Sequence, residues 1–403
     1  MLENLKIARF RFEMVAQEEA VLPKFKGSTL RGGFGYVFKS IACSQEQSGG
    51  KSCQQMCSKG NNACAYGYLF ETCAPANFRG LSAQAEAPGP FVIEPPDDDR
   101  TNFKPGDKLC FDLVLYGRGI EYLPAFIVAF DQLGRTGMGK NGGRFKLERV
   151  SSLSCESVPA SSSNPFIMSS NNGSPTRNVI YDKGRAVASG ITTEDLQFDY
   201  QHVANAANHN LQIALVRRMA RLDTASFFAA ASNSHPATVT PLQLEVRFQT
   251  PLRQKYDHDW LQEPHFAPLM TGILRRAILL NSVHCGGDWE NEWKAAQPLL
   301  EMSQSVQMVT NKTRWVDWDR YSTRQQQKMN LGGLVGSAIY QFPNTQTALQ
   351  LLPLLELARY IHVGKATVFG HGKLATYLLA SASTAAAATP KSDSFTKVVA
   401  KTA

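Results

Sequence analysis

The sequence predicts an α+β protein made of two halves that share one order of elements. In each half a strand of alternating apolar and polar residues precedes an amphipathic helix, and further strands, a helix, a Gly-rich loop and a closing strand follow. The chain has 403 residues, 43% of them hydrophobic, which is enough for two cores of ordinary domain size. These observations favour two ferredoxin-like units in tandem.

Residues 1–150 form the first predicted domain. Residues 8–14 alternate between apolar and charged side chains, as a half-buried strand does. A helix is expected from Ser28, a suitable N-cap. Its apolar positions recur at helical spacing and are Leu30, Phe34, Val37 and Ile41. Glycines at positions 32, 33 and 35 each cost about 1 kcal/mol inside a helix, so we expect a backbone or a phosphodiester to approach them closely.

The remaining elements follow from the same patterns. Residues 108–116 predict a strand, 122–130 a helix, and the Gly-rich stretch after it leads into another strand. The polar residues 151–240 predict a linker or insertion that completes the first domain, with a hairpin around 178–187. Residues 241–380 repeat the order as a second domain, and the Ala-, Ser- and Thr-rich residues 381–403 predict a mobile tail.

A cysteine-rich insertion is expected at residues 43–73, which hold five of the eight cysteines. The chain shows no secretory signal and no apolar run near ~18 residues, so we expect a reducing cytoplasm, where such clusters favour metal over disulfides. Four of the thiols, spaced C-x9-C-x3-C-x6-C, suit a structural zinc ion. They are Cys43, Cys53, Cys57 and Cys64. Replacement of one ligand by Cys73, an iron–sulfur cluster, unligated thiols and a redox-responsive thiol site remain alternatives.

The charge balance points to an anionic partner. The chain carries 42 Lys and Arg against 34 Asp and Glu, a net charge of +8, and nucleic acid is a common partner for such an excess. No Ser-His-Asp order, paired-carboxylate motif or H-E-x-x-H sequence occurs, so hydrolysis of peptide or glycosidic bonds has no support.

The loop at residues 363–373, VGKATVFGHGK, combines three glycines with two lysines and His371. It lacks the order of a P-loop, and it precedes a strand where a dinucleotide loop would open a helix. Its composition suits a cradle for an RNA backbone, and the similar stretch from Gly134 to Lys140 supports this interpretation; an ordinary hairpin turn is the alternative. Aromatic and cationic side chains also alternate in residues 315–336, which suits either single-stranded RNA or a solvated strand with packed tryptophans.

Several of these stretches, taken in order, resemble CRISPR-associated RAMP-superfamily endoribonucleases that process precursor crRNA. They are LPKFKGSTLRGGFGYVFKSIAC (22–43), CAYGYLFE (64–71), FKPGDKLCFDLVLYG (103–117), FQTPLRQK (248–255), WDRYSTRQQQKMNLGGLVG (318–336) and HVGKATVFGHGKL (362–374). The resemblance covers most of the chain, apart from the Ser- and Asn-rich stretch after Val150 and the tail. It implies two ferredoxin-like domains and cleavage within the repeat without a catalytic metal, by attack of a ribose 2′-hydroxyl that leaves a 2′,3′-cyclic phosphate.

Many members of this family use a histidine near the first helix, and this chain has none there. Relatives that lack the histidine work with basic residues and tyrosine, so the resemblance implies catalytic roles around the first helix and in the Gly-rich loop. The candidate catalytic residues are Lys24, Lys26, Arg31, Tyr36 and His371. The candidate RNA-binding residues are Lys39, Arg135, Lys140, Arg144, Arg320, Tyr321, Arg324, Lys365 and Lys373.

The leading hypothesis is therefore an endoribonuclease that cuts CRISPR repeat RNA and stays bound to the product. The alternative is a non-catalytic RAMP subunit that holds a crRNA end within a CRISPR effector complex. The expected partners are precursor crRNA and other effector subunits, with no membrane. Zinc is the expected cofactor, in a structural role.

Overall fold

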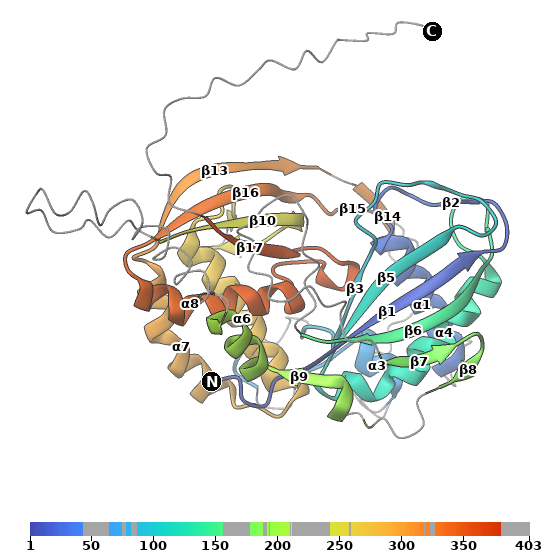
Figure 1. The fold of residues 1–403 in the computed structure, drawn as a ribbon, viewed down its shortest axis with the longest axis horizontal. Helices are drawn as coiled ribbons and strands as arrows, with labels where there is room; N and C mark the ends of the chain where they lie inside the picture. The colour runs from blue at the N-terminus through green and yellow to red at the C-terminus, as the bar shows by residue number, and fades with distance from the viewer. Residues whose placement is uncertain are drawn as a thin grey trace, which may run out of the picture.

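Two antiparallel sheets and the helices packed on them make up the structure (Figure 1). The computed structural model describes residues 1–42, 64–74, 78–81, 87–155, 178–187, 192, 194–209, 211, 242–257, 259–317, 319–322 and 327–379. The predicted α+β class is confirmed by these elements. Within the described residues, no helix has both the length and the apolar character needed to cross a bilayer.

The first sheet is centred on β1 (Lys6–Ala16), whose alternating pattern is confirmed by burial of every second side chain. Its strand order is β3-β5-β1-β6, all antiparallel. These strands are β3 (Phe91–Glu94), β5 (Lys108–Tyr116) and β6 (Phe145–Leu153), and the helices between them are α1 (Gly27–Ala42) and α4 (Leu123–Thr136). The elements therefore run β-α-β-β-α-β along the chain.

The polar region after β6 contributes strands to this first sheet. The predicted hairpin is confirmed as β7 (Val179–Asp182) and β8 (Arg185–Ala186), with β7 paired to β6. After the short turn η3 (Glu194–Leu196), β9 (Gln197–Asp199) pairs with the start of β1, at Lys6 to Ala8. Residues 200–209 are helical. Residues 241 and 381–403 and most of 151–240 lie outside the described residues.

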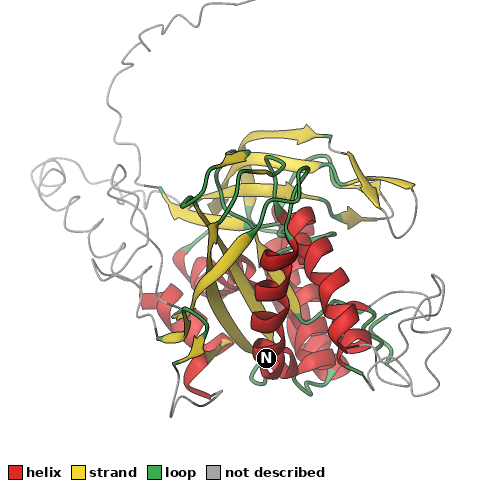
Figure 2. Ribbon diagram, turned by 90° about the vertical axis from the view of Figure 1, so that its right-hand side faces the viewer, coloured by secondary structure: helices red, strands yellow, loops and turns green. Residues whose placement is uncertain are grey.

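The second sheet repeats this order of elements. Its strand order is β13-β16-β10-β17, again antiparallel. The strands are β10 (Leu242–Leu252), β13 (Gln307–Val316), β16 (Gly333–Phe342) and β17 (Leu374–Leu378). The helices are α6 (Phe266–His284), α7 (Trp289–Ser303) and α8 (Thr345–Ile361). Figure 2 shows these helices on one side of the sheet, below its strands.

Short elements complete the described fold. They are β2 (Ala20–Val21) paired with β4 (Asn102–Phe103), α3 (Ala65–Phe70), η2 (Gly117–Tyr122), β11 (Lys255–Tyr256) paired with β12 (Asp259–Trp260), β14 (Asp319–Ser322) paired with β15 (Gln327–Asn330), and η4 (Thr367–Phe369). The pairs β11-β12 and β14-β15 are local hairpins.

The first core explains two of the glycines in α1. Phe34 stacks between Phe126 and Phe130 of α4, with ring centroids 4.5 and 5.1 Å away. A Cβ on Gly33 would lie 2.7 Å from the Leu133 side chain, and one on Gly35 would lie 3.0 Å from Phe70. Here the close neighbours are side chains, whereas the sequence suggested a backbone or a phosphodiester.

Three of the four apolar positions predicted for this helix, Leu30, Phe34 and Val37, are buried. The expectation for Ile41 was wrong, because its side chain is 49% exposed near the end of the helix. The helix also begins at Gly27, one residue before the predicted cap.

The two halves are joined by buried polar contacts between helices and strands. The Tyr116 hydroxyl donates to the carbonyl of Tyr360 at 2.7 Å, and the Tyr68 hydroxyl lies 2.9 Å from His284 Nδ1. Side chains of β1, β3 and β5 belong to the same apolar cluster as α6 and α8. The two units therefore share an interface, which sets how their loops face each other.

Candidate functional site

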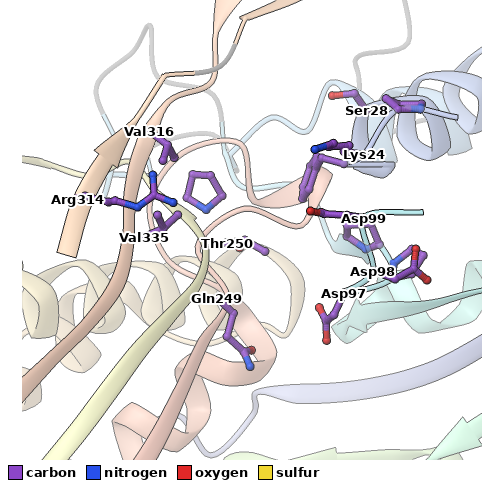
Figure 3. A pocket seen from close by; sticks show the side chains of 15 residues that line it. Lys24, Ser28, Asp97, Asp98, Asp99, Gln249, Thr250, Arg314, Val316 and Val335 are labelled. Atoms are coloured by element: carbon purple, nitrogen blue, oxygen red, sulfur yellow. The ribbon is translucent and has the colours of Figure 1, made fainter. Parts of the chain in front are cut away.

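A cleft of about 1000 Å³ lies between the two halves (Figure 3). The first half lines it with residues 23–28, before and at the start of α1, and with residues 95–99, which follow β3. The second half contributes the end of β10 at Gln249 to Pro251, together with residues of β13 and β16. Loops of the first half and strand ends of the second sheet thus meet at this cleft.

The lining combines flat apolar surfaces with charges of both signs. Phe25 and several prolines provide apolar surface, while Lys24 and Arg314 provide exposed cations. Acidic side chains at positions 97–99 line the same cleft. Apolar planes with cations beside them suit unstacked nucleobases and their phosphates, and carboxylates can accept hydrogen bonds from base amino groups.

The first turn of α1 borders this cleft. Ser28 lines it, and the N-terminus of a helix favours a phosphate because its backbone N–H groups and the helix dipole are positive there. Tyr36 lies two turns further along, on the same side of the helix as Ser28, and is 78% exposed. The Arg31 guanidinium is 4.9 Å from the ring centre of Phe70 and 5.2 Å from that of Phe369.

Of the predicted catalytic residues, Lys24 lines the cleft. Arg31 lies between α3 and the Gly-rich loop, and Tyr36 is exposed on α1. All three come from the segment 24–36, as the sequence indicated.

Lys26 and His371, two of the predicted catalytic residues, occupy buried positions. The Lys26 side chain is fully buried, and its ammonium donates to the carbonyls of Lys24 and Asp98 and to Asp98 Oδ1, at 2.9 to 3.1 Å. It thereby ties the loop before α1 to the loop after β3. His371 is also fully buried, with its ring 5.0 Å from that of Phe25, and burial lowers its pKa to about 4.

The Gly-rich loop is packed between the halves, so its glycines have structural causes. Gly364, Gly370 and Gly372 all have positive φ angles, a region that favours glycine. A Cβ on Gly372 would lie 1.8 Å from the carbonyl oxygen of Val363, and one on Gly370 would lie 2.4 Å from Pro95. The glycines predicted to contact an RNA backbone thus pack against other parts of this chain. Lys365 is the exposed cation of this loop.

The second Gly-rich stretch, Gly134 to Lys140, also packs against other parts of the chain. Gly137 and Gly139 have positive φ angles, and the backbone N–H of Lys140 donates to the carbonyl of Val21 at 2.9 Å. The loop therefore closes against the segment around β2. The expected likeness between the two Gly-rich loops reflects turn chemistry in both.

A buried ionic cluster lies beside the Gly-rich loop and links the two halves. Glu94 of β3 is 2% exposed, and its carboxylate is 2.8 Å from Arg9 Nη2 and 3.2 Å from Lys373 Nζ. His362, which follows α8, places Nε2 3.1 Å from the same carboxylate and Nδ1 2.9 Å from the carbonyl of His371. Burial alone would raise the pKa of Glu94, but Arg9, Lys373 and His362 together hold it well below its usual range.

The same cluster extends along the first sheet. Asp112 pairs with Arg9 at 2.8 Å and with Arg11 at 2.7 Å. Burial alone would lower the pKa of Arg9, but Glu94 and Asp112 raise it, so the guanidinium remains charged. Lys373 thus takes part in holding the two halves together; its predicted role in RNA binding stays a prediction.

The other predicted RNA-binding residues are spread over the molecule. Lys39 lies near the ring of Tyr66, Arg135 pairs with Asp131 at 2.7 Å, Arg144 pairs with Glu18, and Lys140 is exposed in the loop after α4. Arg320 and Tyr321 belong to β14, and Arg324 lies outside the described residues. None of these lines the cleft as the structure describes it.

The cysteine insertion is described only in part. Cys43, Cys53 and Cys57 lie outside the described residues. Cys64 is the N-cap of α3, where its sulfur accepts a hydrogen bond from the backbone N–H of Gly67 at 3.2 Å, and Cys73 follows that helix. The described part of the chain contains no group of three His, Cys, Asp or Glu residues able to hold a metal.

The two lysines of the Gly-rich loop are expected to respond differently to substitution. Changing Lys365 to Ala should weaken RNA binding and reduce its salt dependence, because this side chain is exposed. Changing Lys373 to Ala should lower the free energy of unfolding, because it removes a partner of Glu94. RNA titrations at several salt concentrations and urea unfolding measure the two effects; an unstable Lys365 variant beside a stable Lys373 variant would contradict this assignment.

Residues 95–99 and 249–251 of the cleft were not among the predicted site residues, although 249–251 lie within the quoted stretch 248–255. Of the ionic cluster, the sequence indicated only Lys373, for RNA binding. A signal existed for Glu94, which ends the otherwise apolar run FVIE, and for Arg9 and Arg11 on the polar side of β1. Their partners lie far apart in the chain, so spacing alone does not connect them.

Two family models match the chain. Residues 246–374 match the family CRISPR_Cas6, described as the CRISPR-associated endoribonuclease Cas6. Residues 5–178 match AF_1859_N, described as an N-terminal domain. The comparison with curated proteins finds no match.

Among solved structures, this chain is similar to one in a partial Cas6-RT-Cas1–Cas2 complex, with 13% identity and a TM-score of 0.49. The match covers 94% of this chain and 47% of that one, so this chain spans about half the length of that relative. Cas6 of Thermus thermophilus matches with 13% identity and a TM-score of 0.43, covering 92% of this chain and 98% of that one. A RAMP protein binding different RNA substrates has 9% identity and a TM-score of 0.36, with 92% and 99% covered.

Proposed function

Because residues 246–374 match the family of CRISPR-associated Cas6 endoribonucleases, which confirms the resemblance drawn from the sequence, we propose that this protein cleaves CRISPR repeat RNA in precursor crRNA. The family match is the observation that carries this proposal. A cleft between the halves that offers apolar planes and two exposed cations supports it. Such a role places the protein in a prokaryotic cytoplasm, as a further part of the proposal.

The proposal includes two ferredoxin-like domains. Each half runs β-α-β-β-α-β, with α7 as an additional helix after α6 in the second half, and numbering the four strands by chain order gives the spatial order 2-3-1-4 in both sheets. This is the split β-α-β arrangement of the ferredoxin-like fold. The two domains would together frame the cleft, so neither alone would form the complete binding site.

The proposed reaction is attack of a ribose 2′-hydroxyl on the adjacent phosphodiester. The O–P bond that forms closes a 2′,3′-cyclic phosphate, the P–O5′ bond breaks, and the 2′-hydroxyl proton leaves while the 5′-oxygen gains one. Lys24 and Arg31, with the N-terminus of α1, would stabilise the negative charge that develops on the phosphate. Tyr36 would transfer a proton, since its hydroxyl is exposed on the same side of α1 as Ser28.

Incubating the protein in EDTA with its cognate repeat RNA tests this function. A parallel series carries one 2′-deoxyribose at each position in turn. We expect a single cut that one deoxy substitution abolishes, because that ribose supplies the nucleophile. Tight binding without any cut, or a cut that survives every deoxy substitution, would contradict the proposed chemistry.

A non-catalytic RAMP subunit that holds a crRNA end within a CRISPR effector complex is the second candidate. It is favoured by one observation: none of the described residues that line the cleft is a histidine, and His371 is buried. Binding of repeat RNA without turnover, together with capture by other effector subunits, would support this candidate over the first.

We also propose a structural zinc ion held by Cys43, Cys53, Cys57 and Cys64. Changing Cys57 to Ser is expected to release the metal and lower the thermal unfolding midpoint, because a tetrahedral site loses one thiolate. Metal content by mass spectrometry and thermal unfolding measure both effects, and the matched control is Cys110→Ser, in strand β5. Wild-type protein that is fully stable and metal-free would remove the zinc proposal.

A further inference from the structure

The second sheet has one face that no helix of the described structure covers. The helices α6 and α8 pack against Leu244, Val246 and Phe248 of β10, so the alternate side chains of this strand point to the opposite face. Figures 1 and 2 show this face on the outside of the molecule, above β10, β13, β16 and β17. We call it the outer sheet surface and define it by Arg247, Lys312, Ser337, Ile339 and Tyr377.

Cross-strand register places these residues side by side. Arg247 of β10 lies opposite Ser337 of β16, which lies opposite Lys312 of β13. In the next row, Glu245 of β10 lies between Tyr377 of β17 and Ile339 of β16. The surface therefore spans all four strands.

Its chemistry combines a ring, aliphatic surface and cations. The Arg247 guanidinium lies 4.3 Å from the centre of the Tyr377 ring, and its side chain is 46% exposed. Lys312 is exposed, and Glu245 is paired with Arg247 at 2.9 Å, so two cations face one carboxylate. Guanidinium and tyrosine planes are stacking platforms for unpaired bases, and four-stranded sheets that carry such groups bind single-stranded RNA.

The surface also continues into the cleft. Gln249 and Arg314 each lie two residues beyond Arg247 and Lys312 along their strands, so they share the same face, and both line the cleft. A strand of RNA that leaves the cleft along β10 and β13 would thus cross Arg247, Lys312 and Tyr377.

We propose that the outer sheet surface binds a single-stranded RNA segment that flanks the part held in the cleft. This inference rests on the proposed function, because it takes the cleft as the site of the repeat. The surface would extend the RNA contact beyond the repeat, through stacking and phosphate contacts that are tolerant of sequence.

The test compares fluorescence anisotropy of two RNAs, the repeat alone and the repeat with a single-stranded flank on either side. The variant is Arg247→Gln combined with Lys312→Gln, and Lys294→Gln on α7 is the control, since that lysine is exposed on a helix away from this face. Tyr377→Leu tests stacking separately. Circular dichroism and unfolding midpoints check that every variant is folded.

We expect one of the two flanks to raise the affinity of the wild type for the repeat RNA. For that flanked RNA, the double variant should bind about tenfold more weakly than the wild type at 0.1 M salt, and the slope of log affinity against log salt should be smaller by about 1.4. The repeat alone should bind and be cut as before. The inference is overturned if the wild type and the double variant bind both flanked RNAs with equal affinity. It is also overturned if the double variant loses a protein partner while its affinity for RNA stays unchanged. A wild type that binds flanked RNA through this surface but cuts no repeat contradicts the proposed function and leaves this inference standing.

Discussion

Replacing Glu94 by Ala is expected to lower the free energy of unfolding by about 3–5 kcal/mol, because it leaves buried cations without their shared anion. Glu94 is 2% exposed and contacts Arg9 of the first sheet as well as Lys373 and His362 of the second half. Arg9 keeps Asp112 as a partner, whereas Lys373 keeps only the more distant Asp97, at 3.8 Å. Urea unfolding measures the change.

Two further variants isolate the charge. Glu94→Gln retains the shape and hydrogen-bonding oxygen, so its effect should be smaller than that of Ala. Glu18→Ala removes an exposed carboxylate paired with Arg144, and such surface pairs add little to stability. If Glu94→Ala is as stable as Glu18→Ala, the cluster does not hold the halves together.

The pH dependence of stability provides an independent test of the role of Glu94. The pKa of Glu94 in the folded protein lies well below its ordinary value of 4.5. A carboxyl with a lowered folded pKa contributes stability above its unfolded pKa and loses it as pH falls towards the folded value. The difference in stability between wild type and Glu94→Gln should therefore be constant above about pH 5 and shrink below about pH 4.

The fold was predictable because its signals are local. Alternation in residues 8–14 and from Leu242, and helical spacing in α1 and α6, each depend on a single element and its own periodicity. The order of these elements then limits the topology. The hairpin of β7 and β8 was also predictable from a local pattern. The three-residue strand β9 was not, since so short a segment carries no clear alternation and depends on β1 for pairing.

The site was predictable only in part because it is assembled from distant segments. The segment 24–36 was found through its basic residues and glycines, but the cleft also needs residues near positions 97, 250 and 314. Glycines alone do not identify a phosphate site, because packing and positive φ angles require glycine as strictly as phosphate binding does. A lysine such as Lys26 also becomes structural when a distant carboxylate neutralises it.

Changing Arg31 to Gln is expected to lower the rate of repeat cleavage at least about 100-fold, because the variant loses the cation that we propose stabilises charge on the reacting phosphate. The guanidinium is held between the rings of Phe70 and Phe369, so its position is fixed before RNA binds. Loss of these contacts should cost only about 0.5–1 kcal/mol of stability. Single-turnover cleavage at saturating protein separates the rate from binding, and unfolding midpoints report folding.

The matched control is Arg118→Gln, an exposed arginine of η2 that also stacks on a ring of α3, with its guanidinium 5.1 Å from Tyr68. The Arg118→Gln variant should cut at nearly the wild-type rate, because Arg118 stacks on a ring of α3 as Arg31 does but does not adjoin the Gly-rich loop. Tyr36→Phe completes the set: it removes one hydroxyl from a largely exposed side chain, and a loss of about 100-fold or more would identify proton transfer. Wild-type cleavage by both Arg31→Gln and Tyr36→Phe would exclude these two side chains of α1 from the chemistry. Equal losses in Arg118→Gln would show that the reaction requires stacking on α3 rather than charge at the phosphate.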